Sequence, residues 1–365
     1  MRILVQLGHP AQYHFFKNSI SKWIDSGHKV RVLIRSKDVL EELIQNSGFE
    51  YVNIEKKRLS PNLQKNILVF GLIRLYQLFF QQLRFLPHIV ISPDPVLAKI
   101  CKFFPANFIA VGEDDYFVIE KLANFLFPSV NHIVAPKVCD YSPWQNKKIE
   151  FEGYMKLAYL HPNQFVPNIK RIEDYLHKKK YVIIRLVSLS AHHDVGIKGI
   201  DNVILDRIIS VFEKMDFQIF ISSEKVVDEK YLKYQQDIPV TLMHDLLAYS
   251  SFLVCDSQSL AVEASMLGIP SVRFNDFAGK ISVLNELENK YELTYGIHSS
   301  EPEKLFAKLD ELLALPDLKE EFQQRRQTML ADKIDVTAFF VWFIENYPES
   351  ARIMKDNPDY QYHFK

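Results

Sequence analysis

The sequence predicts an α/β protein with two domains, each built on a doubly wound parallel sheet. Short apolar runs alternate with helical patterns through most of the 365 residues, a repetition typical of parallel sheets. Runs such as "RILVQL", "HIVIS" and "FIAVG" are continuously apolar rather than alternating, as expected for strands buried on both faces. The rhythm stops over residues 137–180 and restarts at "YVIIRLV", so we expect two similar halves.

The expected elements follow the chain in order. In the first half they are strands at 2–7, 30–35, 50–54, 88–92, 107–111 and 131–135, with helices at 11–26, 38–46, 63–85, 95–104 and 117–127. In the second half they are strands at 181–187, 217–223, 251–256 and 270–274, with helices at 199–215, 243–250, 258–267 and a helical segment to about 332. Three prolines and the basic run "HKKK" between the halves indicate a boundary. The predicted domains are therefore 1–150 and 181–334, joined by a linker at 151–180, and the apolar helix within 335–365 is expected to cross back onto the first domain.

Composition excludes several classes of protein. Apolar residues make up 48% of the chain and charged residues 24%, as in globular proteins. The net charge is −1, which gives no reason to expect a nucleic-acid partner. The three cysteines, Cys101, Cys139 and Cys255, are far apart and lack metal-ligand spacing, so a reducing compartment is expected rather than a disulfide framework.

No targeting or membrane-spanning segment is expected. The N-terminal strand is interrupted too early for a signal peptide, and no apolar run reaches the ~18 residues that a membrane span requires. The segment "NILVFGLIRLYQLFFQQLRF" is the nearest case, but arginines and glutamines interrupt it. The helix expected at 63–85 is either a core helix or one whose partly exposed apolar face contacts a membrane surface. The protein is thus expected in the cytoplasm, or peripherally at the inner face of the membrane.

Polar residues of the first half follow expected strands, where parallel sheets place their ligand sites. The loop "GHPAQYHFF" contains His9 and His14, which are either catalytic bases or surface histidines at a capped helix. Asp94 lies between two prolines in "SPDPV", and Glu113 begins the carboxylate run of "VGEDDYF". Paired carboxylates can divide acid and base roles if their environments differ, and helix capping is the alternative.

The loop "VSLSAHHDVGIKG" follows the first expected strand of the second half. Its polar side chains face a phosphate or a sugar in one interpretation, and belong to a plain loop in the other; they include Ser188, Ser190, His192 and His193. We expect no metal site here, because adjacent histidines do not normally face one ion and no HxxxH spacing is present.

The segment "CDSQSLAVEASMLGIPSVRFND" passes from a strand directly into a helix. Ser257, Gln258 and Ser259 would present hydroxyl, amide and backbone N–H groups to a diphosphate at the helix N-terminus. Glu263 lies one turn further on, where a carboxylate can accept hydrogen bonds from a ribose diol. The alternative is a capped helix with a buried Glu263, and since an unpaired buried carboxylate is costly, a ligand or protein partner is needed.

The stretch "HDLLAYSSFLVCDSQSLAVEASMLGIPSVRF" resembles the nucleotide-binding signature of the glycosyltransferase-B (GT-B) superfamily, and the resemblance covers nearly the whole chain. The superfamily fold implies two Rossmann-like domains facing across a cleft. The similarity is closest to the non-hydrolysing UDP-N-acetylglucosamine 2-epimerases, in which an Asp-Ser-Gly-Gly stretch holds the diphosphate and a following Glu holds the ribose. The resemblance assigns the diphosphate to residues 257–259 and the ribose to Glu263. It also implies that His192, in "SAHHDVG", matches a family histidine, and that Asp94 and Glu113 fall where the family keeps catalytic carboxylates.

The sequence also departs from these families. Gln258 and Ser259 replace the two glycines, and the second-domain loop lacks the epimerases' arginines. The first loop matches neither the epimerases nor the Gly-rich pattern of the lipid-linked N-acetylglucosaminyl transferases. As a whole, the chain most resembles an uncharacterised domain family often found among surface-polysaccharide genes.

Three functions follow as hypotheses. The first is a glycosyltransferase of polysaccharide or glycolipid biosynthesis, with a nucleotide sugar (a UDP-sugar) as donor, a sugar or lipid-linked acceptor, and His9, His14 or Glu113 as base. The second is a nucleotide-sugar 2-epimerase that uses Asp94, Glu113 and His192. The third is a binding module without catalysis. None requires a metal or a cofactor, and peripheral membrane contact is assigned to residues 63–85.

Overall fold

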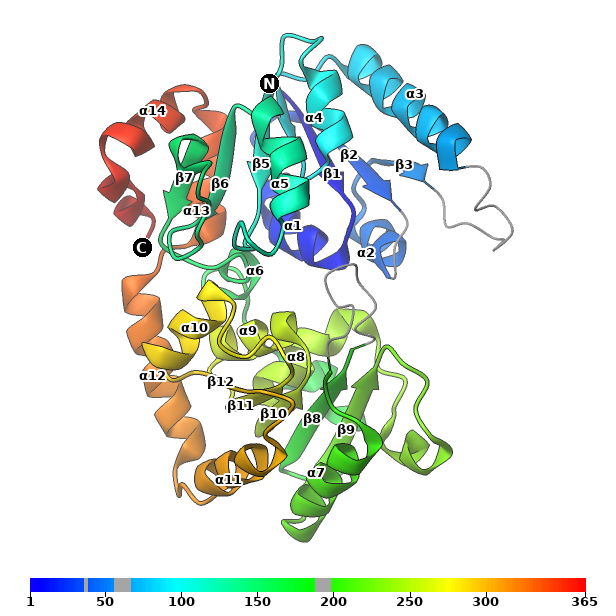
Figure 1. Ribbon diagram of the computed structural model, residues 1–365, viewed down its shortest axis with the longest axis vertical. Helices are drawn as coiled ribbons and strands as arrows, with labels where there is room; N and C mark the ends of the chain where they lie inside the picture. Colours follow the sequence, from blue (N-terminus) through cyan, green and yellow to red (C-terminus); the bar gives the residue numbers. More distant parts are fainter. Residues whose placement is uncertain (36–38, 56–66, 188–197) are drawn as a thin grey trace. The chain divides into compact units, whose positions relative to one another are not determined.

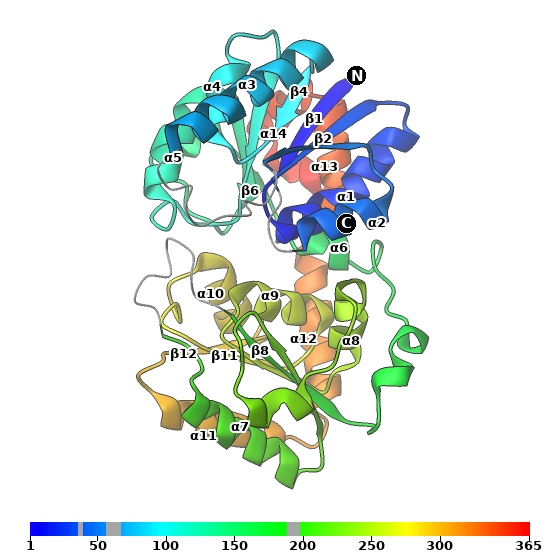
Figure 2. The same cartoon turned by 90° about the vertical axis from the view of Figure 1, so that its right-hand side faces the viewer.

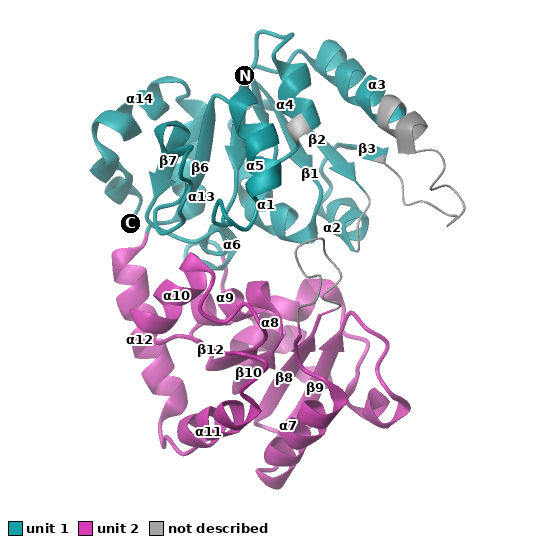
Figure 3. Cartoon of the chain, viewed as in Figure 1, with its two compact units in different colours: residues 1–164, 334–365 teal, residues 165–333 magenta. Residues whose placement is uncertain are grey.

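A computed structural model describes residues 1–35, 39–55, 67–187 and 198–365, and the chain divides into two compact units. Unit 1 combines Met1–Gln164 with Ile334–Lys365, and unit 2 consists of Phe165–Lys333 (Figure 3). Residues 151–164 thus belong to unit 1 and residues 165–180 to unit 2. Each unit has a parallel sheet between two layers of helices (Figure 1).

The sheet of unit 1 has seven strands in the order β3-β2-β1-β4-β5-β6-β7, all paired in parallel. The strands are β1 (Arg2–Leu7), β2 (Lys29–Arg35), β3 (Tyr51–Glu55), β4 (Ile89–Ile91), β5 (Asn107–Val111), β6 (His132–Pro136) and β7 (Lys148–Phe151). Strand β1 pairs with β2 from Arg2↔Lys29 to Leu7↔Ile34, and with β4 from Ile3↔Ile89. Its residues Ile3, Leu4 and Val5 are fully buried, because helices cover both faces of the sheet.

The helices of unit 1 form a layer on each face of this sheet. They are α1 (Pro10–Asp25), α2 (Leu40–Ser47), α3 (Ile67–Phe85), α4 (Pro95–Cys101), α5 (Glu120–Leu126), α6 (Leu157–Leu160), α13 (Val336–Glu345) and α14 (Glu349–Asp356). Helices α1, α2 and α13 lie on one face, and α3, α4 and α5 on the other (Figure 2). The chain reverses its direction of winding between β1 and β4, which is why helices before and after that point occupy opposite faces.

The C-terminal segment completes the core of unit 1. Helix α13 begins at Asp335, whose carboxylate accepts a hydrogen bond from the Ala338 N–H at 3.0 Å. The Phe340 ring packs edge-on against Phe15 and Phe16 of α1, with centroids 5.2 and 5.8 Å away. The Thr337 hydroxyl donates to the Ala158 carbonyl at 2.6 Å. This helix is therefore an integral part of unit 1.

The sheet of unit 2 has five strands in the order β12-β11-β10-β8-β9, again all parallel. The strands are β8 (Tyr181–Leu186), β9 (Gln218–Ser223), β10 (Phe252–Cys255), β11 (Ser271–Phe274) and β12 (Tyr295–Ile297). The helices are α7 (Asn202–Lys214), α8 (Met243–Tyr249), α9 (Gln258–Leu267), α10 (Ser282–Asn289), α11 (Pro302–Leu313) and α12 (Leu318–Asp332). Helices α8, α9 and α10 cover one face and α7 and α11 the other (Figure 2), while α12 packs against α9.

The described residues also form short 3₁₀ segments. They are Phe127–Ser129, Gln145–Lys147, Ile169–Arg171, Glu173–Tyr175, Glu229–Tyr234, Val240–Leu242 and Pro358–Phe364. None of the helices in the described part of the chain is long and apolar enough to cross a membrane.

The predicted class of fold is confirmed, but two strands were not anticipated. Strand β7 was missed because its sequence "KIEF" alternates charged and apolar residues, as suits the edge of a sheet. Strand β12 was missed because it has only three residues, one of them Gly296. The helix expected at 63–85 is observed from Ile67, and residues 63–66 lie outside the described part. All three cysteines are buried and unpaired.

Candidate active site and nucleotide site

Each sheet has one point where the direction of winding reverses, and such points are where open parallel sheets bind ligands. In unit 1 the reversal falls between β1 and β4, and in unit 2 between β8 and β10. At the carboxyl ends of these strands, His9 follows β1, Asp94 follows β4 and Asp256 follows β10. Strand β8 is followed by residues 188–197, which lie outside the described part of the chain. The two edges belong to different units.

Asp94 is held by several groups at the reversal point of unit 1. Its Oδ1 accepts hydrogen bonds from the N–H groups of Val96 and Leu97, at 2.8 and 3.3 Å, which caps α4. Its Oδ2 accepts from the Gln6 amide at 3.0 Å and forms an ion pair with Arg74 of α3. Both carboxylate oxygens are thus engaged, so Asp94 ties β1, α3 and α4 together; its catalytic role stays a prediction.

Glu113 follows β5 at the same edge and is paired with a cation. One carboxylate oxygen accepts from the Met155 N–H at 2.6 Å, and the other forms an ion pair with Lys156. Each side chain of this pair is about 12% exposed. Of the two following carboxylates, Asp114 is exposed, whereas Asp115 is buried and accepts from the Asp140 N–H at 2.9 Å. Glu113 is therefore the member of the run that is both partly accessible and held in place.

His9 caps helix α1. Its Nδ1 accepts a hydrogen bond from the Ala11 N–H at 3.2 Å, and the side chain is exposed. In a neutral imidazole that accepts through Nδ1, the proton resides on Nε2. In this state His9 is a donor toward the edge of the sheet, and it would lose the cap if it accepted a proton at Nδ1.

His14 lies one turn further along α1 and is half-buried. Its ring packs against Tyr13 and against Tyr159 of α6, each with centroids 5.3 Å apart. Lys156, the partner of Glu113, immediately precedes α6. The structure thus connects His14 and Glu113 through the two ends of α6, an arrangement that nothing in the sequence signalled.

In unit 2, the junction between β10 and α9 has the predicted geometry of a helix N-terminus. Ser257 is the N-cap, and its hydroxyl accepts from the Leu260 N–H at 3.3 Å. Gln258 and Ser259 are the first residues of the ten-residue helix, half-buried and exposed respectively. The unpaired N–H groups of this first turn and the helix dipole favour an anion.

Glu263 has a protein partner. Its Oε2 lies 3.7 Å from Nε2 of His244, the second residue of α8, and both side chains are about 12% exposed. The His244 ring packs edge-on to Phe165 with centroids 6.1 Å apart. The need for a partner was predicted, but His244 was not singled out, since its pairing with Glu263 depends on the packing of α8 against α9.

Asp256 lies at the same edge, but it was not predicted as a site residue. Its buried side chain accepts from the Val187 N–H at 2.7 Å through Oδ1. Its Oδ2 has no hydrogen-bond partner among the described residues, and Lys225 lies 4.0 Å away. Burial raises the pKa of Asp256 to about 6, and the Val187 hydrogen bond and the Lys225 charge limit the rise. Its position directly after a buried strand was the available signal.

Two cations lie at the ends of the neighbouring strands. Arg185 of β8 donates to the Ser222 hydroxyl at 2.7 Å and pairs with Glu224. Lys225 follows β9 and is partly exposed. Lys225 gives this edge positive charge that α9 alone does not supply, whereas the charge of Arg185 is balanced by Glu224.

Four predicted residues cannot be placed. Ser188, Ser190, His192 and His193 lie outside the described residues, so their assignment to phosphate, sugar or catalysis stays a prediction. Within the described ranges, no group of three or more His, Cys, Asp or Glu side chains could hold a metal ion.

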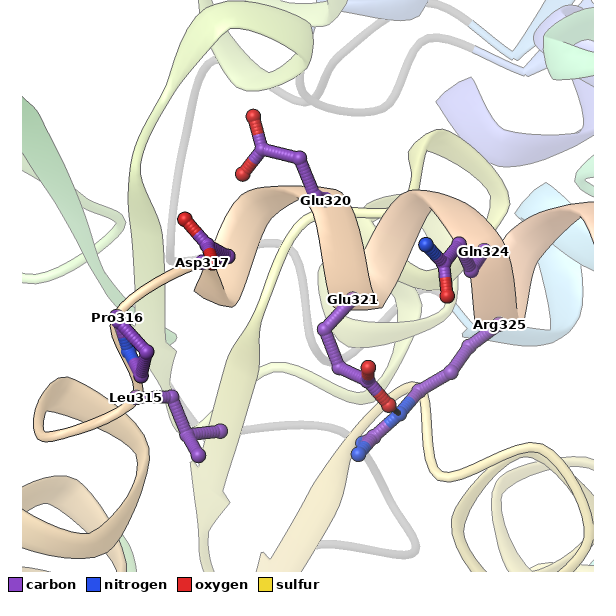
Figure 4. Close-up of a pocket in the computed structure, with 7 residues that line it drawn as sticks. All are labelled: Leu315, Pro316, Asp317, Glu320, Glu321, Gln324 and Arg325. Atoms are coloured by element: carbon purple, nitrogen blue, oxygen red, sulfur yellow. Dashed lines mark hydrogen bonds and ion pairs between the residues drawn. The ribbon is translucent and has the colours of Figure 1, made fainter.

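A surface hollow of unit 2 lies elsewhere, where α11 ends and α12 begins. It is lined by Leu315, Pro316, Asp317, Glu320, Glu321, Gln324 and Arg325 (Figure 4). Since α11 follows β12 and runs back along the sheet, this junction is at the amino-end edge, opposite the strand ends described above. Its three carboxylates would repel a diphosphate, and Arg325 is already paired with Glu321 at 2.9 Å, so we do not assign the nucleotide to it.

Comparison with known proteins supports the fold. The Staphylococcus aureus MnaA–UDP co-structure matches with a TM-score of 0.65 at 12% identity, covering 96% of this chain and 97% of that one. UDP-GlcNAc 2-epimerase from Neisseria meningitidis bound to UDP-GlcNAc matches with a TM-score of 0.62 at 12% identity, covering 88% and 94%. Glycosyltransferase VinC in complex with DTDP matches with a TM-score of 0.60 at 13% identity, covering 98% and 100%.

These matches define the class of the molecule: the chain has the GT-B fold, which the resemblance had implied. At such low identity they show the fold alone, since one fold hosts several chemistries. No protein-family model and no curated protein sequence matches the chain.

Proposed function

We propose that the chain is a glycosyltransferase that uses a nucleotide sugar, with a UDP-sugar as the first donor to test. The observation that supports this most is the β10–α9 junction, where a Ser257-capped helix N-terminus lies at the reversal point of the unit 2 sheet. Two of the named neighbours are bound to UDP or UDP-GlcNAc and a third to DTDP. The donor is a substrate in this proposal, and no cofactor is required.

The donor would be held from three sides of this edge. Ser257, Gln258, Ser259 and the first-turn N–H groups would receive the diphosphate, with Lys225 adding positive charge. These groups stabilise the charge that develops on the diphosphate as the bond to the sugar breaks. Glu263, kept in place by His244, would accept hydrogen bonds from the ribose hydroxyls. The predicted phosphate or sugar contacts of Ser188, Ser190 and His193 belong to the same proposal.

The acceptor would be activated by a residue of unit 1. We assign proton removal from the hydroxyl of a sugar or lipid-linked acceptor to His14 or Glu113, which the two ends of α6 connect. His9, with its proton on Nε2 in the capped state, suits donation to an oxygen that gains charge.

A nucleotide-sugar 2-epimerase is the second candidate, supported by the named epimerases among the neighbours. It would require Asp94, Glu113 and His192 as acid and base groups near C2 of the sugar. The transferase is preferred because it requires one base, for which His14 is a candidate, whereas the epimerase requires both Asp94 and Glu113. The oxygens of Asp94 are already engaged by Arg74, Gln6 and the α4 N–H groups, and those of Glu113 by Met155 and Lys156.

The first experiment is calorimetric titration of the protein with UDP, GDP, CDP, TDP and CMP. We expect one nucleotide to bind saturably and the substitution Glu263→Ala to weaken it at least tenfold, which corresponds to about 1.4 kcal/mol. Glu311→Gln is the matched control, since this carboxylate of α11 pairs with Lys308 on the surface. Absence of binding by all five nucleotides would reject both the transferase and the epimerase. The remaining hypothesis would then be a binding module without catalysis.

The reaction is then tested with the matching nucleotide sugar in deuterated water. A transferase releases the nucleoside diphosphate only when an acceptor is present and leaves C2 protonated. Deuterium at C2 of the recovered sugar would instead establish the epimerase.

A further inference from the structure

Helix α3 has its apolar side chains outside and polar ones inside. The outward side chains are 37% to 67% exposed and comprise Ile73, Leu75, Tyr76, Phe79, Phe80 and Leu83. On the inward side, Gln82 is fully buried together with Leu78, and Arg74, Gln77 and Gln81 are half-buried. A helix that only packs on a sheet shows the opposite distribution. The orientation of α3 thus leaves an apolar face without a described partner.

Polar contacts fix this orientation. Arg74 forms an ion pair with the buried Asp94. The Gln81 amide oxygen accepts from Arg31 of β2 at 3.3 Å, and the Arg31 guanidinium lies 4.5 Å from the centroid of the Phe85 ring. Turning the helix to bury its apolar face would break these contacts and leave the Asp94 charge buried without its cation.

The apolar face continues onto the neighbouring helices. Helices α3, α4 and α5 lie side by side on one face of unit 1 (Figures 1 and 2), and the Phe79 ring meets Phe104 at 5.3 Å. We call the exposed large apolar side chains of these helices and of the residues near their ends the α3–α5 surface; besides the six of α3 it includes Leu122 and Phe125 of α5 and, outside the helices, Leu86, Phe103 and Phe117. More than half of the exposed large apolar side chains of the described residues are in this set. So large a set in one place marks an interaction surface.

The charges on this surface are mostly positive. The exposed charged residues within 73–86, 96–103 and 117–125 are Arg84, Lys99, Lys102, Lys121 and Glu120, although the whole chain has a net charge of −1. Two of the cations lie beside aromatic rings, with Arg84 at 5.1 Å from the centroid of Phe80 and Lys99 at 3.2 Å from that of Phe125. The cations are therefore interleaved with the apolar side chains.

We propose that the α3–α5 surface docks on an anionic membrane. Aromatic and aliphatic side chains would enter the boundary between headgroups and acyl chains, while the lysines and arginine contact lipid phosphates. A second copy of the chain fits less well, because a two-fold contact would bring two basic surfaces together. This proposal does not rest on the proposed enzymatic function, although docking would bring a lipid-linked acceptor to the enzyme.

The test is co-sedimentation of the full chain with vesicles of phosphatidylcholine, with and without phosphatidylglycerol. We expect binding to the anionic vesicles, and at least tenfold weaker binding after Tyr76→Ser with Leu83→Ser, two side chains that are 67% and 51% exposed. Lys102→Gln with Lys121→Gln should also weaken binding and reduce its sensitivity to salt. Val203→Ser with Met215→Ser is the matched control, because these side chains are exposed on unit 2. This variant should bind the vesicles as the wild type does.

Circular dichroism and UDP titration of each variant separate the outcomes. Loss of vesicle binding with unchanged folding and nucleotide affinity supports the proposal. The proposal is overturned if the wild type does not sediment with anionic vesicles, or if the control variant loses binding as strongly as the α3–α5 variant. It is also overturned if sedimentation velocity shows a dimer that Tyr76→Ser with Leu83→Ser dissociates, since the occupant is then a second copy.

Discussion

The buried carboxyl group of Asp256 links the stability of unit 2 to pH. Its pKa is raised by burial from 3.8 to about 6, so folding favours the protonated form. This contribution to stability is complete below pH 3.8 and is lost as the pH rises through 6. We predict that the free energy of unfolding falls by about 2 kcal/mol through this group between pH 4 and pH 7.

Replacement of the carboxyl group tests that prediction. Asp256→Asn keeps the oxygen that accepts from Val187 and removes the charge, so the variant should be more stable than the wild type at pH 7 and equal to it near pH 4. Urea unfolding at both pH values measures the difference. Glu288→Gln is the comparison variant, because burial also raises the pKa of Glu288. If the free energy of unfolding of Asp256→Asn changes with pH as steeply as that of the wild type, the pH dependence comes from another group.

Gly296 leaves space for a buried guanidinium group. A methyl group at this position would lie 2.5 Å from Nη2 of Arg273 and 3.1 Å from Oε2 of Glu288, and Arg273 is fully buried. We predict that Gly296→Ala destabilises unit 2 by about 1–3 kcal/mol, measured by urea unfolding. Gly8→Ala, where the nearest atom is 3.8 Å away, should be close to neutral.

A double-mutant cycle isolates the cause. Arg273→Met leaves the partly buried Glu288 without its neighbouring cation, so it should itself destabilise unit 2, but it should relieve most of the Gly296→Ala effect. Strict additivity of the two changes would mean that the clash is with another group.

At this scale, the positions of site residues could be predicted from the sequence, but their partners could not. Asp94, Glu113 and Glu263 were predicted because they follow buried strands or lie one helical turn from such a site. Their partners Arg74, Lys156 and His244 come from other elements, and no local pattern predicts contacts that only the packing of those elements creates.

At the scale of elements, Ser257 sets the start of α9. We predict that Ser257→Ala destabilises unit 2 by about 1 kcal/mol, because the Leu260 N–H loses its acceptor. Ser257→Gly should cost only about a few tenths of a kcal/mol, since glycine is tolerated at this position. Chemical unfolding of the two variants checks this, and an alanine variant as stable as the wild type would show that the hydroxyl does not act as a cap.

Both substitutions also test the nucleotide proposal. If the Ser257 hydroxyl contacts the diphosphate, alanine and glycine should weaken UDP binding to the same extent although their stabilities differ. Calorimetry on the two variants makes this comparison, and affinity that follows stability would point to an indirect effect.

Helix α3 shows why the location of an element is easier to predict than its orientation. The apolar periodicity indicated a helix, but both a buried and an exposed apolar face were compatible with it. The orientation depends on the long-range pairs of Arg74 with Asp94 and Arg31 with Gln81. Strands β7 and β12 were missed for a different reason: β7 is not continuously apolar, and β12 has only three residues, one of them glycine.

At the scale of the whole molecule, unit 1 needs the C-terminal segment. Phe339, Phe340, Phe343 and Ile344 of α13 are fully buried, and fully burying each such side chain is worth about 1.5–3 kcal/mol. We predict that a chain ending at Lys333 loses cooperative unfolding of unit 1, because this loss is comparable with the total stability of a domain. Unit 2 should still unfold cooperatively and bind UDP.

Calorimetric scans of the full and shortened chains make the comparison. UDP should raise the unfolding temperature of the transition that survives in the shortened chain. Two intact transitions in the shortened chain would show that α13 is dispensable. Phe340→Ala, a smaller change, should destabilise only the unit 1 transition, by about 3–5 kcal/mol.

The two parallel sheets could be predicted because burial on both faces makes their strands continuously apolar. The division of the chain between the units is harder to infer, since it depends on contacts between segments far apart in sequence, such as Phe15 with Phe340.

That division has a consequence for protein synthesis. Unit 1 begins first on the ribosome, but α13 and α14 are synthesised only after all of unit 2. Unit 2 is contiguous in sequence and can therefore finish folding before α13 has been synthesised. Until then, the side of α1 around Phe15 and Phe16 remains uncovered. During that interval the growing chain exposes an aromatic surface to which a chaperone can bind, until α13 has been synthesised and covers it.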